Sequence, residues 1–129
     1  MRASRRVALV SLLLCPWACA RDPLRVATIQ VGRSLNSDNS VAAITTRFKP
    51  GDTMYAAVIT AGPGAGTLSV RWLSAGRVLT EETRNVRYND RAATAFHMNF
   101  AGGLPPGQYR VELFLDGEPI GARDLTVEN

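Results

Sequence analysis

The chain contains one histidine, His97, which is the first residue to consider for catalysis or metal binding. Histidine is the side chain whose ordinary pKa suits general base catalysis and metal ligation near neutral pH. A zinc site needs several ligands at short spacings, and no second histidine is available to supply one. No Gly-x-Ser-x-Gly sequence occurs that would present a nucleophilic serine. The sequence favours a protein that is not an enzyme, and a hydrolase that uses His97 stays open as an alternative.

Two glycine-rich segments invite comparison with phosphate-binding loops: residues 61–66, AGPGAG, and residues 101–107, AGGLPPG. Such a loop binds phosphate because a helix follows it and points its free N–H groups at the ligand. Both segments here precede alternating, strand-like runs, so we expect turns and no bound cofactor. Residues 36–40, NSDNS, contain oxygen donors but a single carboxylate, Asp38, which is too few for a calcium loop. We expect a polar turn there and no metal.

The first 20 residues have the pattern of an export signal. A basic start, MRASRR, precedes the apolar run VALVSLLL, and Ala18-Cys19-Ala20 gives the small residues at which signal peptidases cut. Eight apolar residues are far fewer than the roughly 20 that span a bilayer. We predict a signal peptide over residues 1–20 and an exported protein. Cleavage after Ala20 would release it to the periplasm or medium, whereas acylation of Cys19 would make it a membrane-anchored lipoprotein.

Removal of this leader changes the charge of the chain. The whole sequence has 15 Lys and Arg against 11 Asp and Glu, a net charge of +4. Three of the basic residues lie in residues 1–20, so the rest of the chain carries a net charge of +1. Nucleic-acid binding needs a dense basic surface, so we expect no nucleic-acid partner. Contact with a membrane is expected only through a lipid on Cys19.

From residue 24 onward, short alternating runs are separated by turn sequences. In LSVRW, for example, Leu68, Val70 and Trp72 share one face of a strand. The same alternation points Phe96, Met98 and Phe100 inward. Turn residues recur about every 8–12 positions, as in a β-sandwich or barrel. The predicted strands are residues 24–31, 41–48, 53–61, 67–74, 77–87, 93–100, 108–115 and 119–127. Residues 21–129 are therefore expected to form one all-β domain.

Particular turns follow from particular residue pairs. Lys49-Pro-Gly-Asp52 places proline and glycine where a type II turn requires them. Asp116-Gly117 is the strongest signal for a two-residue hairpin.

Several of these segments together resemble the immunoglobulin-like β-sandwich of small exported bacterial proteins and lipoproteins. They are FKPGDTMY at residues 48–55, Trp72 on a later strand, and PGQYRVE at residues 106–112 with Asp116-Gly117 beyond it. The resemblance implies a sandwich of seven to eight mostly antiparallel strands with Trp72 in its core. It also implies that Tyr109 forms a tyrosine corner. The cysteine pair of antibody domains is absent, and no catalytic residues are implied.

β-Sandwiches commonly present end loops and open strand edges to partners, so we expect a non-catalytic binding or scaffolding module of the bacterial cell envelope, with a protein or other envelope component as its partner. Phe114 is expected to point away from the core, because Leu113 and Leu115 point into it. The predicted interaction surface combines Phe114, Arg110, the loop at residues 62–66 with Gly64, and the loop at residues 101–107. One alternative is an inhibitor that inserts its Gly-Pro-Gly loop into an exported hydrolase. The other is the hydrolase that uses His97.

Overall fold

The computed structural model describes residues 22–129. The predicted signal peptide, its cleavage site and Cys19 lie outside the described residues. Within residues 22–129 there is no helix of the length and apolarity needed to cross a membrane.

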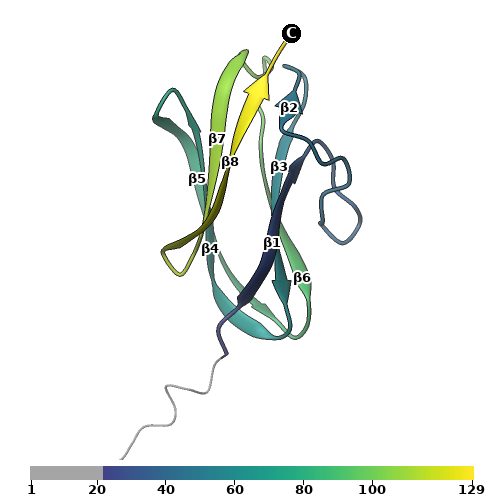
Figure 1. The fold of residues 1–129 in the computed structure, drawn as a ribbon, viewed down its shortest axis with the longest axis vertical. Coiled ribbons are helices and arrows are strands. Elements are labelled where there is room, and N and C mark those ends of the chain that lie inside the picture. The colour runs from purple at the N-terminus through teal and green to yellow at the C-terminus, as the bar shows by residue number, and fades with distance from the viewer. Residues whose placement is uncertain (1–21) are drawn as a thin grey trace, which may run out of the picture.

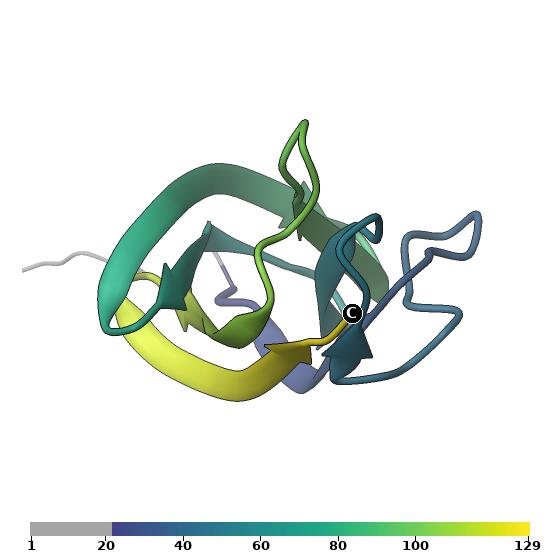
Figure 2. The ribbon, with the colours of Figure 1, turned by 90° about the horizontal axis from the view of Figure 1, so that it is seen from above.

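The described chain is all-β, with eight strands in two sheets that face each other (Figures 1 and 2). One sheet has the order β1-β3-β6 and the other the order β2-β8-β7-β4-β5. All pairs are antiparallel except the short parallel pair of β2 with β8. The strands are β1 (Arg25–Gly32), β2 (Arg47–Phe48), β3 (Met54–Ala61), β4 (Gly64–Ser74), β5 (Arg77–Tyr88), β6 (Ala92–Met98), β7 (Gly107–Leu115) and β8 (Glu118–Val127).

The main core lies between the sheets and confirms most of the predicted inward faces. Leu68, Val70 and Trp72 on β4 are all buried, and Trp72 is only 1% exposed. Phe96 and Met98 on β6 are buried opposite them. The prediction for Phe100 is wrong, because β6 ends at Met98 and Phe100 is 38% exposed in the following loop.

The predicted strand over residues 41–48 is mostly wrong. Only Arg47–Phe48 pair in a sheet, and residues 33–46 form a loop held by two isolated bridges, Gly32 with Ile44 and Leu35 with Val41. This loop packs on the outer face of the three-stranded sheet, where Val41 forms a second buried cluster with Ala57 and Ile59. Burial on both faces explains why β3 is apolar at nearly every position.

The turns agree in part with their sequence signals. Asp116 and Gly117 both have positive φ, as a two-residue type I′ hairpin requires, which confirms the hairpin. Lys49-Pro-Gly-Asp52 closes with a 2.9 Å hydrogen bond from the N–H of Asp52 to the carbonyl of Lys49. Gly51 lacks the positive φ of a type II turn, so that assignment is wrong. The Asp52 carboxylate instead accepts the N–H of Lys49 at 2.8 Å and stabilises another turn type.

The hairpin between β4 and β5 contains an unfavourable residue. Ala75 has φ 53° and Gly76 has φ 77°, yet alanine pays a steric penalty in this left-handed region. Asparagine tolerates the region far better, so Ala75→Asn is expected to raise the free energy of unfolding by about 0.5–1 kcal/mol. Gly76→Ala should lower the free energy of unfolding by about 1–2 kcal/mol. The added Cβ would contact no other atom, but the positive φ at this position is unfavourable for a residue with a side chain. Urea denaturation of both variants checks the opposite signs, and two shifts of the same sign would contradict this account.

Tyr109 forms the predicted tyrosine corner at the start of β7. Its side chain is buried, and its hydroxyl donates a hydrogen bond to the carbonyl of Pro105 at 2.5 Å. The prolines and Gly107, with φ 143°, turn the chain so that this bond can close. Residues 101–107 therefore make a structural corner that leads into β7.

Burial raises the pKa of the Tyr109 hydroxyl above its ordinary value of 10.0. A raised folded pKa means that stability is full below pH 10 and is lost as pH rises through the folded pKa. Tyr109→Phe removes the hydrogen bond and should cost about 0.5–1.5 kcal/mol at neutral pH. It should also flatten the decline in stability above pH 10. Urea denaturation between pH 7 and 11 tests both, with Tyr55→Phe as the control. An unchanged alkaline decline in Tyr109→Phe would contradict the assignment.

Candidate functional site

Arg110 and Phe114 lie together on the outer face of the five-stranded sheet, hereafter the Phe114 face. Their neighbour Glu112 shares this face, because Val111 and Leu113 are buried between the sheets. The two buried apolar clusters of residues 22–129 lie between the sheets and beneath the 33–46 loop. Neither covers the Phe114 face.

A chain of alternating charges crosses this face. Register places Arg71 of β4 opposite Glu112 of β7, and Arg110 of β7 opposite Asp124 of β8. Glu112 accepts hydrogen bonds from Nε of Arg71 and Nε of Arg110, both at 3.2 Å. Arg110 also donates to Asp124 at 2.9 Å. The carboxylates of Asp124 and Glu112 raise the pKa of Arg110, so it stays a cation.

Phe114 borders a shallow hollow beside this charge chain. The guanidinium carbon of Arg71 lies 5.0 Å from the centre of the Phe114 ring, a cation–π distance. The volume of the hollow is about 340 Å³, and its lining residues are Ser69, Val70, Arg71, Glu81, Thr83, Phe114 and Gly117. Among the described residues, Glu81 forms no ion pair. The hollow therefore offers an aromatic ring, hydroxyl groups and a free carboxylate, a set suited to binding another surface.

Gly64 does not join this face. It is buried, and a Cβ placed on it would lie 2.8 Å from the carbonyl oxygen of Pro23. β3 ends at Ala61 and β4 starts at Gly64, so only two residues connect them, and the Gly-Pro-Gly segment is a tight turn. Residues 62–66 therefore do not form the projecting loop that an inhibitor would insert into a hydrolase.

The two predicted contact loops lie at opposite ends of the sandwich. Leu115 pairs with Leu68, close to the start of β4, whereas Tyr109 pairs with Ser74 at the end of β4. Residues 62–66 precede Leu68, and residues 101–107 precede Tyr109. One compact contact surface cannot include both loops.

His97 lies on the outer face of the three-stranded sheet, on the other side of the molecule from Phe114. It is exposed, and its ring centre is 6.1 Å from that of Tyr55 at a tilted angle. Over residues 22–129 its side chain forms no hydrogen bond or ion pair, and no group of three His, Cys, Asp or Glu residues could hold a metal. The described geometry brings no serine or carboxylate to the imidazole for hydrolysis.

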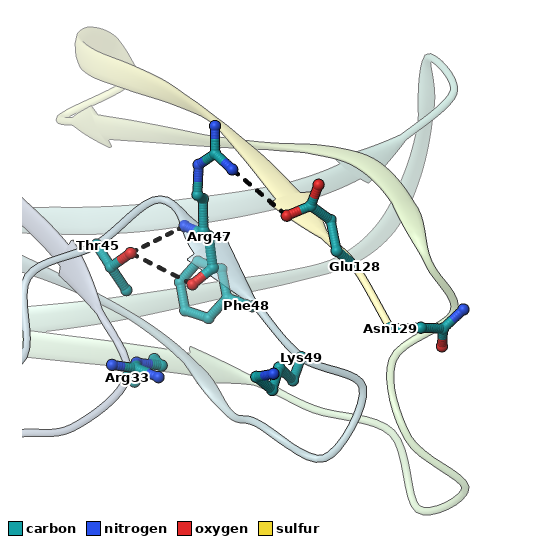
Figure 3. Close-up of a pocket in the computed structure, with 7 residues that line it drawn as sticks. All are labelled: Arg33, Thr45, Arg47, Phe48, Lys49, Glu128 and Asn129. Carbon is teal, nitrogen blue, oxygen red and sulfur yellow. Dashed lines mark hydrogen bonds and ion pairs between the residues drawn. The ribbon is translucent and has the colours of Figure 1, made fainter.

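A second hollow, of about 280 Å³, lies where β2 meets the end of β8 (Figure 3). Its lining residues are Arg33, Thr45, Arg47, Phe48, Lys49, Glu128 and Asn129. Arg47 pairs with Glu128 at 3.5 Å, whereas Arg33 and Lys49 have no ion pair among the described residues. The sequence analysis missed this basic hollow, because only the parallel pairing of β2 with β8 brings residues 47–49 beside Glu128.

Comparison with solved structures supports the architecture. An immunoglobulin-like protein from Pseudomonas aeruginosa is similar with a TM-score of 0.57 and 14% identity, over 84% of this chain and 99% of that one. An alkylpurine DNA glycosylase of Pseudomonas fluorescens, solved with DNA containing an abasic site analog, is similar with a TM-score of 0.53 and 8% identity. That match covers 84% of this chain and 31% of the glycosylase. No family model and no curated protein matches this sequence. Identities this low establish an immunoglobulin-like fold and nothing about activity.

Proposed function

We propose that the chain is a non-catalytic binding or scaffolding module of the bacterial cell envelope and that it contacts its partner through the Phe114 face. The observation that carries the proposal is the position of Phe114, an aromatic ring that borders a hollow on a sheet face left uncovered by the described chain. Phe114 is only partly buried by its neighbours on this face. A partner that covers the rest of the ring would remove its remaining apolar surface from water.

The residues around Phe114 suit a protein partner. Binding energy at protein interfaces is concentrated in aromatic and arginine side chains, and both types occur here as Phe114 and Arg71. Arg71 is already held by Glu112, so its guanidinium loses little freedom when a partner stacks on it. Glu81 offers a carboxylate for a basic group on the partner, which adds specificity to the contact.

Site-specific photo-crosslinking in the producing bacterium tests this face. A photoreactive residue at Thr83 would line the hollow, one at His97 would report the opposite sheet, and one at Lys49 would report the basic hollow. We expect a discrete adduct between Thr83 and a different protein that Phe114→Ala abolishes, while the other two positions give none. Adducts restricted to His97 or Lys49, or a Thr83 adduct with a protein other than a second copy of this chain that survives Phe114→Ala in a folded variant, would contradict the proposal.

Export is a separate part of the proposal, and it rests on residues 1–20. The mass of the protein purified from soluble and membrane fractions tests it. A soluble species that starts at residue 21 would support signal cleavage, and an acylated membrane species that starts at Cys19 would support a lipoprotein. A cytoplasmic species that retains residues 1–20 would contradict export.

A further inference from the structure

We propose that two copies of this chain pair antiparallel along β5, so that their five-stranded sheets join into one sheet of ten strands. β5 is the last strand of its sheet, with β4 on one side and no described strand on the other. It runs along the outside of the molecule in both views (Figures 1 and 2). The inference does not depend on the proposed function.

β5 is the longest sheet edge of the described chain. It has 12 residues, whereas the other edge strands have 8 in β1, 7 in β6 and 2 in β2. No proline interrupts it. An edge strand presents unpaired N–H and C=O groups that template pairing with another strand, and natural proteins usually block such edges by shortening, bulging or charging them. β5 is long beyond its one bulge, and its inward-pointing charges restrict pairing to a strand that carries opposite charges at the matching positions.

The regular part of this edge starts at Thr80. Trp72 pairs with Thr80 and Leu73 pairs with Val78, so Leu79 has no partner and forms a bulge. From Thr80 to Val86 the side chains alternate strictly. Those opposite inward residues of β4 point inward, and Glu81, Thr83 and Asn85 point outward.

Symmetry limits how two β5 strands can pair. A twofold axis perpendicular to the sheet keeps the outer faces of both copies on the same side. Residues directly opposite each other must then come from the same face of the strand. The axis therefore lies between the two copies of one residue, and that residue faces itself across the axis. The central residue of the pair defines each allowed register.

Among the three central registers, the charges on the inward side of β5 favour one. An axis at Glu82 or at Arg84 places two like charges directly opposite each other, which destabilises antiparallel pairs. An axis at Thr83 instead places Glu82 of each copy opposite Arg84 of the other, twice. Within one copy Arg84 already binds Glu82 at 2.6 Å, so the dimer would join these two pairs into a cluster of four charges. The edge is thus complementary to a second copy of itself.

The expected partner can be tested with charge reversals. Glu82→Arg and Arg84→Glu each turn both opposite-charge contacts of the dimer into like-charge contacts. From typical cross-strand pair energies, each change should weaken self-association about 30-fold. A mixture of the two single variants should form a heterodimer, because arginines on one strand then face glutamates on the other. The double variant Glu82→Arg/Arg84→Glu should recover self-association.

Sedimentation equilibrium of the purified protein over a series of concentrations measures each of these species. Circular dichroism serves as a folding control, since Arg84 also lies 4.3 Å from the ring centre of Phe96 and its loss can affect the fold. Glu82→Arg leaves that contact in place. A wild-type protein that is monomeric at every concentration would overturn the proposal. Any partner strand for β5 would then have to come from another protein. Single reversals that leave association unchanged would overturn it too.

Discussion

Trp72→Ala is expected to lower the free energy of unfolding by about 3–5 kcal/mol, which is the usual cost of removing a large buried aromatic side chain. Trp72 lies on β4, which is hydrogen-bonded to β5 on one side and β7 on the other. It is only 1% exposed and is among the largest fully buried side chains of the described residues. Domains of this size are stable by about 5–15 kcal/mol, so the variant should lose a large part of its stability.

Urea denaturation followed by far-ultraviolet circular dichroism measures this loss without relying on tryptophan fluorescence. Val78→Ala is the matched control, because Val78 belongs to the same sheet but is 47% exposed. Its free energy of unfolding should change by less than about 0.5 kcal/mol. A loss below about 1 kcal/mol in Trp72→Ala would mean that the two sheets do not depend on this side chain for their packing.

The central strands could be predicted from the sequence because they bury one face only. In β4 and β7 an apolar residue at every second position identifies the inward side chains, and the same alternation predicts that Phe114 points outward. The segment at residues 41–48 shows the limit of this approach. Val41 is buried against the three-stranded sheet, whereas Ile44 is 68% exposed. The burial of apolar residues here is set by the path of the loop and not by the alternation of a strand.

Contacts of the candidate site depend on which strands are neighbours, and alternation does not contain that information. Arg71 and Glu112 are 41 residues apart and meet only because β4 pairs with β7 in one particular register. The basic hollow depends in the same way on the parallel pairing of β2 with β8. Gly64 illustrates the opposite error. Its sequence is typical of an exposed loop, yet the approach of Pro23 buries it.

Gly32→Ala is expected to lower the free energy of unfolding by about 1–3 kcal/mol, the usual cost of adding a methyl group to a closely packed site. A Cβ at Gly32 would lie 2.1 Å from the carbonyl oxygen of Ala43 and 2.5 Å from Cγ1 of Val41. The obstacle includes backbone, so the 33–46 loop has to move. Hydrogen exchange should then show lost protection for the N–H of Arg33 and of Thr45, which bond to Ala43 and Val31 in the wild type.

Gly102→Ala is the control for this variant, since a Cβ there meets no atom within 4 Å and the residue does not have a positive φ. Its stability and hydrogen exchange should stay at wild-type values. Retained protection of Thr45 in Gly32→Ala would contradict the account. The result also bears on function, because movement of the loop uncovers Ala57 and Ile59 on the three-stranded sheet. If Gly32→Ala binds other proteins that the wild type does not bind, then the loop normally covers the outer face of the three-stranded sheet. The Phe114 face would then be the sheet face that remains open to a partner.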